Sequence, residues 1–407
     1  MKNNRNIMDW WVGTSLVVRI LFGLMIGAAL GIGLPSWTAI GIFGRLFVSA
    51  LKGIAPILVA VLVMASVARA GKGLGRRFSS LVTIYLLSTF IAAVCAVVGS
   101  FIFPVTLELG EAVEVEGTVS SLSDVFTNLV TSMVQNPVSA VANANYIAIL
   151  FWSIVLGVAL KFIASETTIN VVNDLAMVVS RVVKWIIQFA PFGIMGLVFT
   201  TVSENGLSVF STYGHILLLL CGCMLVNTFI FNPLISFIML RRNPYPLLFT
   251  CLKESGLNAF FTRSSAANIP INMALCKKLE LDEDFYSVSI PLGATINMDG
   301  AAVTITVFSL AVAHTVGIEV TFASALFLCM IATLGACGAS GVVGGSLLLI
   351  PMACSFFGIG NDVAMQAVAI GFIIGVVQDS VETALNSSGD AFFTATAEYY
   401  DRRKRNA

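Results

Sequence analysis

Charged residues are scarce in this sequence. Asp, Glu, Lys and Arg make up 11% of the 407 residues, whereas an ordinary soluble domain contains about 25%. Hydrophobic residues make up 57%. This composition excludes a soluble globular protein and predicts an integral membrane protein. The formal net charge is zero, so nucleic-acid binding has no electrostatic support.

Histidine is nearly absent, and its scarcity argues against an intramembrane protease. Residues Gly338–Gly341 match the Gly-x-Ser-Gly motif of such enzymes, but their serine nucleophile needs a histidine base. The chain has two histidines, His215 and His314, and both precede Ser340. In the rhomboid pattern the base lies on a later span. We therefore expect that the protein is not an enzyme.

Paired cysteines are lacking too. The eight cysteines lie almost entirely in apolar stretches, and their spacing does not indicate a disulfide framework. Cys221 and Cys223 could suggest a metal site, but no acidic residue lies near them in sequence. The pattern favours small side chains that pack between helices.

Long apolar runs occupy the first half of the chain. Four of them are long enough to cross a hydrocarbon core of about 30 Å: Ser15 to Leu34, Thr38 to Ala65, Leu81 to Phe103 and His215 to Leu240. Gly and Ala recur within these runs, as expected where helices pack closely in lipid. We predict six spans in residues 1–240.

The few charged residues indicate an orientation. Lys2 and Arg5 precede the first span, and Arg402–Arg405 lie at the end of the chain. The loop from Glu108 to Asp124 has five acidic residues and no Lys or Arg. Because cytoplasmic loops carry the excess of Lys and Arg, we expect both termini in the cytoplasm and this loop outside.

Residues 241–407 show a different pattern, with two interrupted apolar segments. Residues 252–279 have charge at both ends and a polar centre, Thr262–Pro270, and residues 322–357 have a glycine-rich centre. We expect each segment to enter and leave the membrane on one side, as a re-entrant hairpin. A polar-marked span follows each hairpin, at about residues 284–313 and 363–397.

The unit of hairpin and span thus occurs twice, in opposite orientations. The predicted fold is an all-α integral membrane protein with eight transmembrane helices and two re-entrant helical hairpins, arranged as inverted repeats. Inverted repeats with broken helices are typical of secondary transporters. An ion channel is an alternative, but the two hairpins do not supply the symmetric filter that such pores usually have.

The motif Asn297–Gly300 lies between long apolar runs. On a regular helix, the side chains of Asn297 and Asp299 would point about 200° apart, so both can face one site only if the helix opens there. Gly293 and Gly300 make that opening easier. Freed carbonyls and a carboxylate are ligands for a hard cation such as sodium. The alternative is a turn between two shorter helices.

The last apolar segment carries a polar stripe. Asp379, Thr383, Asn386 and Asp390 are spaced i, i+4, i+7 and i+11, which places them on one helix face. Four polar residues on one face, with Glu382 beside them, favour the lining of a site over a single interhelical hydrogen bond.

The third span carries Tyr85, Ser88 and Thr89 at i, i+3 and i+4. Their spacing places the three hydroxyls on one helix face. From the residues alone, interhelical hydrogen bonds are the interpretation that we favour for them.

The polar motifs of the second half resemble those of the dicarboxylate/amino acid:cation symporter family. That family includes the glutamate transporters and a bacterial sodium:serine/threonine symporter. The resemblance covers essentially the whole chain. Ser264-Ser265 and Gly341–Gly344 are similar to the tips of the family's two hairpins. Asn297–Gly300 is similar to its sodium-binding motif, and Asn386–Asp390 to the closing motif of its last span.

The resemblance implies three sites for co-transported sodium. The first site would use carbonyls of Gly293 and Asn297, the backbone at Asn386, and the Asp390 carboxylate. The second would use Tyr85, Ser88, Thr89, Asn297 and Asp299. The third would use Thr295 and carbonyls near the second hairpin tip.

The resemblance also implies a substrate site. Asp379 would bind the substrate ammonium and Asn386 its carboxylate, while the two hairpin tips close around the substrate. The implied substrate-binding residues are Ser264, Ser265, Val342, Gly344, Asp379, Thr383 and Asn386.

Departures from the family pattern point to the substrate. Members that carry acidic amino acids have an arginine at the position of Glu382 and a threonine at that of Ala301. A carboxylate at this place would repel a substrate carboxylate. Arg263 could compensate from the first hairpin, or pair with Glu382 or Asp379. Val343 also replaces the usual proline of the second hairpin.

A small hydroxyl-bearing amino acid fits these departures, with Thr383 among the groups that hold its hydroxyl. The resemblance therefore implies sodium-coupled import of serine and threonine across a bacterial inner membrane by alternating access. It also implies a homotrimer, with residues 1–240 mainly as scaffold and residues 241–407 as transport core. The alternatives are another small neutral or acidic amino acid, or coupling to protons.

Overall fold

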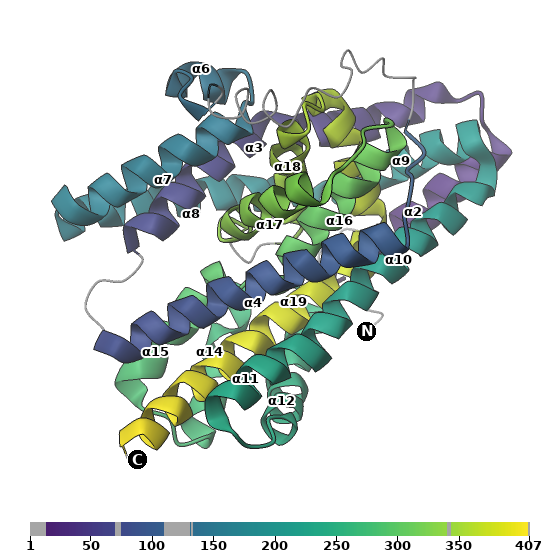
Figure 1. Ribbon diagram of the computed structural model, residues 1–407. Coiled ribbons are helices and arrows are strands. Elements are labelled where there is room, and N and C mark those ends of the chain that lie inside the picture. Colours follow the sequence, from purple (N-terminus) through teal and green to yellow (C-terminus); the bar gives the residue numbers. More distant parts are fainter. Residues whose placement is uncertain (1–13, 70–74, 110–130, 132, 340–342, 406–407) are drawn as a thin grey trace, which may run out of the picture.

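The computed structural model describes residues 14–69, 75–109, 131, 133–339 and 343–405, and the regular structure in these ranges is helical (Figure 1). Six helical segments are long and apolar enough to cross a membrane, and a bent pair, Glu166–Gln188 with Ala190–Glu204, makes a seventh. The chain is therefore a multi-pass membrane protein. The predicted all-α class is confirmed within the described ranges.

Two helix groups are visible. The first group holds α2 (Leu16–Gly33), α3 (Gly41–Arg69), α7 (Tyr146–Ile163), α8 (Glu166–Gln188) and α9 (Ala190–Asn205). Here α2 packs on α9, and α3 packs on α7, α8 and α9. Glycines allow these approaches: a Cβ at Gly23 would lie 2.1 Å from the carbonyl oxygen of Pro191. Close backbone contact of this kind stabilises helix pairs in lipid.

The second group surrounds a long C-terminal helix. Its members are α4 (Gly75–Ile102), α10 (Val209–Val226), α11 (Asn232–Leu240), α15 (Glu283–Ile296), α16 (Asp299–Thr315) and α19 (Asn361–Arg405). In Figure 1, α4, α19 and α10 run side by side, and they contact one another. The most apolar 18-residue window of the α15–α16 segment is 100% buried, compared with 33% for α7. The α15–α16 segment is therefore enclosed by other helices of the protein, whereas α7 is not.

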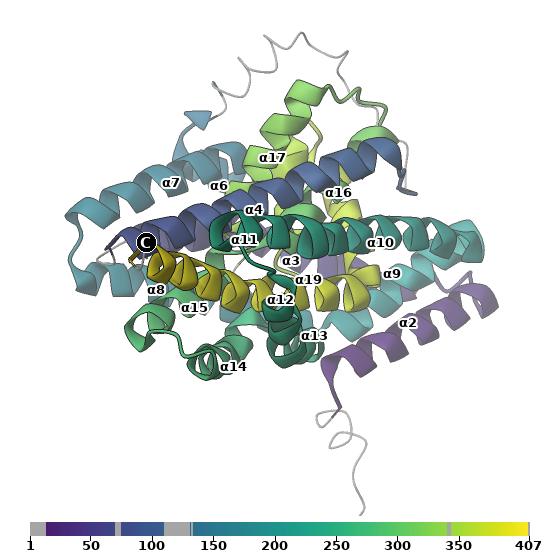
Figure 2. The ribbon, with the colours of Figure 1, turned by 60° about the horizontal axis from the view of Figure 1, so that its bottom comes forward.

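Both predicted hairpins contain two helical arms. The first comprises α12 (Tyr245–Cys251), a π-helical turn (Leu252–Gly256), α13 (Leu257–Thr262) and α14 (Ser265–Lys278). The chain turns at Arg263, which has a left-handed φ of 52°, and the Ser264 hydroxyl accepts the N–H of Ala267 to cap α14. Figure 2 shows α12, α13 and α14 grouped in the lower part of the view, where they pack against α19.

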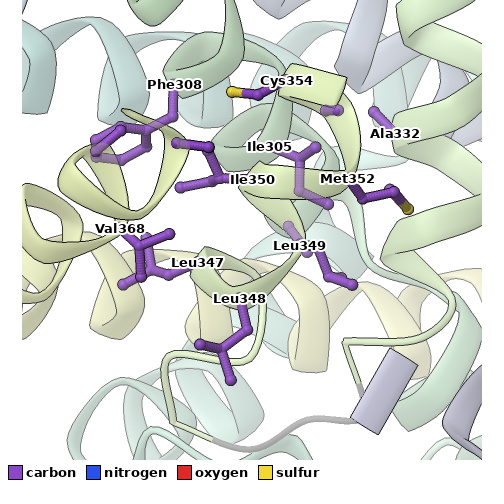
Figure 3. Close-up of a cluster of buried hydrophobic side chains, with 14 of the residues drawn as sticks. Ile305, Phe308, Ala332, Leu347, Leu348, Leu349, Ile350, Met352, Cys354 and Val368 are labelled. Atoms are coloured by element: carbon purple, nitrogen blue, oxygen red, sulfur yellow. The ribbon is translucent and has the colours of Figure 1, made fainter. Parts of the chain in front are cut away.

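The segment predicted as the second hairpin comprises α17 (Phe322–Ala336), a 3-10 turn (Leu347–Leu349) and α18 (Ile350–Phe356). An apolar cluster holds it against α16 and α19 (Figure 3). Ile305 and Phe308 of α16 and Val368 of α19 belong to this cluster, and all three are fully buried. The cluster thus fixes one side of the second group, while the polar residues lie elsewhere in it.

Candidate functional site

The polar stripe of the last segment lies on α19, which is continuous through it. Asp379, Thr383, Asn386 and Asp390 are all buried, with exposed fractions of 6% or less. The predicted helical spacing is therefore confirmed. Since α19 contacts α13, α14, α15, α16 and α18, the stripe lies among the elements that carry the other predicted residues.

Asp299 accepts hydrogen bonds from four side chains. Its Oδ1 accepts from Ser88 Oγ at 2.5 Å and from Thr89 Oγ1 at 3.1 Å. Its Oδ2 accepts from Asn227 Nδ2 and Asn232 Nδ2, both at 2.9 Å. The structure thus brings Ser88 and Thr89 to Asp299, as the resemblance implied, and satisfies a buried carboxylate with uncharged donors.

Asn227 and Asn232 are residues that the sequence prediction missed. Five positions apart on an α-helix, their side chains would point about 140° apart. Residues 227–231 form a π-helical turn instead, with i→i+5 hydrogen bonds that bring the two side chains to one face. The available signal was two asparagines within an apolar run, the second directly before Pro233.

The helix opens at Asn297 and Met298, between α15 and α16. Neither residue has α-helical dihedral angles: Asn297 has a ψ of 80° and Met298 a ψ of 52°. The predicted opening is present, but it does not turn the two polar side chains to one site. It turns the Asn297 side chain toward α19 while Asp299 faces α4 and α11.

Asn297 and Asp390 form a second cluster of oxygens. Asn297 Nδ2 donates to Asp390 Oδ1 at 3.0 Å and to the carbonyl of Asn386 at 3.3 Å. Asn297 Oδ1 and Asp390 Oδ2 are buried and have no hydrogen-bond partner in the described part of the chain. A Cβ at Gly293 would lie 2.7 Å from Asp390 Oδ1. Buried oxygens without donors are groups that a hard cation satisfies.

The Tyr85 hydroxyl belongs to this second cluster rather than to the ring around Asp299. It lies 3.3 Å from the Asp390 carbonyl oxygen, 3.4 Å from that of Ser289, and 3.2 Å from Thr394 Oγ1. The structure therefore separates Tyr85 from Ser88 and Thr89.

Asp379 joins the two hairpins. Arg263 Nε donates to Asp379 Oδ2 at 2.7 Å, and the N–H of Gly344 donates to Oδ1 at 3.1 Å. A second guanidinium nitrogen of Arg263 donates to the carbonyl of Gly375 at 3.1 Å. Both charged side chains are at most 6% exposed. Of the three possibilities for Arg263, the structure shows the pair with Asp379.

Glu382 is held through one of its oxygens. Oε2 accepts hydrogen bonds from Thr304 Oγ1 at 2.8 Å, Ser346 Oγ at 2.9 Å and Gln378 Nε2 at 2.5 Å. These three donors leave Oε1 available to a further donor. A Cβ at Gly300 would lie 2.9 Å from Glu382 Cγ, so the glycine makes room for this side chain.

The remaining predicted residues differ in their surroundings. Asn386 Oδ1 accepts the N–H of Gly300 at 2.8 Å, and Ser265 and Ala301 are buried. The Thr295 hydroxyl donates to the Leu292 carbonyl of its own helix. Val342 lies outside the described residues.

Three sets of contacts therefore lie around α19: the ring at Asp299, the oxygens at Asp390, and the charged pair at Asp379. Within the described ranges, no group of three His, Cys, Asp or Glu side chains forms a metal site. Mixed carbonyl, amide, hydroxyl and carboxylate oxygens suit a weakly bound hard cation better than a resident transition metal.

Comparison with known proteins agrees with these features. The model of the sodium:dicarboxylate symporter family matches residues 16–399. The serine/threonine transporter SstT of Bifidobacterium adolescentis is 57% identical over 396 residues, which are 97% of this chain and 92% of that protein. The serine/threonine transporter SstT of Streptococcus thermophilus is 52% identical over 395 residues, 97% and 98% of the two chains.

Proposed function

The chain belongs to the sodium:dicarboxylate symporter family, and we propose that it imports serine and threonine with sodium across the bacterial inner membrane. The observation that carries the coupling to sodium is the pair of partnerless buried oxygens on Asn297 and Asp390. The similarity of nearly the whole chain to two serine/threonine transporters supports the substrate.

Sodium would bind first where oxygens lack donors. One ion takes the Asp390 carboxylate, with the amide oxygen of Asn297 and carbonyls of Gly293, Asn297 and Asn386 close by. The positive ion offsets the cost of a carboxylate in the membrane interior. The Tyr85 hydroxyl, which lies 3.3 Å from the Asp390 carbonyl oxygen, would lie beside this ion.

A second ion would bind at Asp299, where the hydroxyls of Ser88 and Thr89 can turn their lone pairs toward it. Asn227 and Asn232 would keep holding Oδ2 and so fix the carboxylate. A third ion would use Thr295 and carbonyls of the second hairpin.

The substrate would enter by an exchange of partners at Asp379. In the structure, Arg263 neutralises this carboxylate. The ammonium of an amino acid can replace the guanidinium, so that the buried carboxylate is never left unpaired. The substrate carboxylate then lies near Asn386, and the tips of the hairpins, with Ser264, Ser265, Val342 and Gly344, close over it.

Glu382 would select the side chain. Its carboxylate repels the side-chain carboxylate of aspartate or glutamate. Its Oε1, to which Thr304, Ser346 and Gln378 do not donate, accepts the hydroxyl hydrogen of serine or threonine. Thr383, the next residue of α19 and also buried, would be among the groups that hold this hydroxyl.

Alternating access would move one helix group against the other. We assign residues 1–240 mainly to the scaffold, except for α4, α10 and α11, which pack on α19. Residues 241–407 form the transport core, and the whole would have eight spans and two re-entrant hairpins in a homotrimer with cytoplasmic termini. Apolar contacts support such sliding: Phe47 of α3 packs on Phe372 of α19 with ring centroids 5.1 Å apart.

Uptake of labelled serine into proteoliposomes tests the proposal. An inward sodium gradient should drive serine accumulation, and replacement of sodium by choline should abolish it. Uptake that is unchanged in choline would refute coupling to sodium. Uptake that follows an imposed proton gradient instead would establish the alternative ion.

A further inference from the structure

A cavity of about 940 Å³ lies between α4 and α10, away from Asp379 and Asp390. Its lining changes along its length. Thr106, Thr212 and His215 lie at one end, just beyond α4 and in the first two turns of α10. Apolar side chains and the thiols of Cys95 and Cys223 line the rest. The cavity therefore has one polar end, and the rest of its lining is mainly apolar.

The cavity extends along α10 over a distance close to the thickness of one membrane leaflet. His215 and Val226 lie near its two ends, and eleven residues of α-helix rise about 16 Å. That is close to half of a hydrocarbon core of about 30 Å. Two lining residues, Ile102 and Leu218, are 62% and 72% exposed on helices that face lipid, so a ligand can enter sideways from the bilayer.

The charge of the lining selects the head group. Among the described residues that line the cavity there is no Asp, Glu, Lys or Arg. A permanently charged phosphate diester would find no cation there. A carboxylic acid, which can be protonated at a membrane surface, is matched by the hydroxyls of Thr106 and Thr212 and the imidazole of His215.

We propose that this cavity binds a long-chain fatty acid, with its carboxyl group at His215 and its chain directed toward Val226. The deep end adjoins the ring around Asp299, because Val226 precedes Asn227. There α4 and α10 also touch: the thiol of each of Cys95 and Cys223 lies 3.7 Å from the other's carbonyl oxygen. An occupant therefore acts on the spacing between α4, which carries Ser88 and Thr89, and α10, which continues into the π-helical turn of Asn227.

Photo-crosslinking tests the binding without requiring transport. The full-length protein in nanodiscs is irradiated with a palmitic acid that carries a diazirine on its chain, and the labelled peptides are mapped. We expect saturable labelling of residues 95–106 and 212–226 that excess palmitate displaces. Label spread equally over α7 and α8, or label that palmitate does not displace, would overturn the proposal.

Two glycines of α10 provide a matched pair of variants. A Cβ at either Gly222 or Gly214 would meet nothing within 4 Å, but only Gly222 lines the cavity. Gly222→Leu should lower labelling about tenfold, and Gly214→Leu should leave it unchanged. Equal labelling of both variants would contradict the site. Saturable labelling by a diazirine phosphatidylglycerol of the same chain length would overturn the assignment to a free fatty acid.

The effect on Asp299 rests on the proposed sodium symport and is measured separately. Palmitate should shift the sodium concentration that gives half-maximal serine uptake in the wild type and in Gly214→Leu, but not in Gly222→Leu. Labelling without this shift would retain the binding site and reject its effect on sodium. Absence of any sodium dependence would instead reject the proposed function and leave the labelling result standing.

Discussion

The helix α7 and the α15–α16 segment are both apolar enough to span a membrane, yet they differ in nearly every other respect. A third of the most apolar window of α7 is buried, whereas that of α15–α16 is buried entirely. Helix α7 is continuous and is capped by Asn145, while α15–α16 opens at Asn297 and carries Asp299. Lipid tolerates only closed helices. The open backbone and the acidic residues of this segment lie in the interior, where side chains of neighbouring helices satisfy Asp299, while Asn297 Oδ1 has no partner among the described residues.

The largest expected effect comes from the most buried charge pair. Asp379→Asn should abolish serine uptake, since an amide cannot pair with the substrate ammonium. It also leaves Arg263 buried without its partner, which costs about 3–5 kcal/mol of stability. Labelled-serine uptake and the thermal unfolding midpoint measure the two effects.

The matched control is Asp362→Asn, which removes a carboxylate whose side chain is 86% exposed beside Lys52. Exposed ion pairs contribute about 0–1 kcal/mol, so uptake and unfolding should change little. Near-normal transport by Asp379→Asn would refute the role of Asp379 in binding the ammonium group. It would also show that the buried and the exposed carboxylate matter equally little for transport.

A smaller effect is expected at the oxygens of the second cluster. Asp390→Asn should raise the sodium concentration for half-maximal uptake about 10- to 100-fold. The reason is that loss of the interaction between sodium and a charged ligand costs about 1.5–3 kcal/mol of binding free energy. Sodium titration of serine uptake measures it. Asp284→Asn, an exposed acid in the first turn of α15, is the control, and an equal shift in both variants would contradict the site.

Glu382 gives a prediction about selectivity. Glu382→Gln removes the negative charge, so aspartate should inhibit serine uptake about tenfold more strongly, a difference of about 1.4 kcal/mol. Inhibition by alanine, which has no side-chain carboxylate, should change much less. Aspartate and alanine that respond alike would show that Glu382 does not read the substrate side chain.

The smallest effect concerns one donor to Asp299. Asn232→Ala removes one of four hydrogen bonds, worth about 1 kcal/mol, and should raise the sodium requirement about fivefold. Asn173→Ala is the control, because Asn173 is buried but donates to the Ile169 carbonyl of its own helix, α8. If the sodium requirement rose in Asn173→Ala but not in Asn232→Ala, Asn232 would not support sodium binding at Asp299.

Patterns within one helix were predictable from the sequence. The stripe from Asp379 to Asp390 follows from helical spacing alone. Gly293 and Gly300 indicated the opening near Asn297, although Asn297 and Asp299 then face different helices. In the two segments predicted as hairpins, helices end where serine and glycine interrupt the apolar runs, α13 at Thr262 and α17 at Ala336. In each case a local rule of geometry decides the outcome.

Contacts between distant segments were not predictable. Arg263 had three candidate partners, and only the left-handed turn at the tip of the first hairpin directs it to Asp379. Asn227 and Asn232 both contact Asp299 because residues 227–231 form a π-helical turn. Two asparagines in an apolar run do not by themselves predict such a turn. Tyr85 shares a helix face with Ser88, but its hydroxyl lies 3.3 Å from the Asp390 carbonyl oxygen of α19 instead.

The length of α19 has a practical consequence. A helix of 45 residues is about 68 Å long, whereas a bilayer with its head groups is about 40–45 Å thick. Its last turns therefore project beyond the membrane on the same unbroken rod that carries Asp379. A fluorophore fixed rigidly to those turns would act as a pointer, and its polarisation would report each tilt of the substrate site in single molecules.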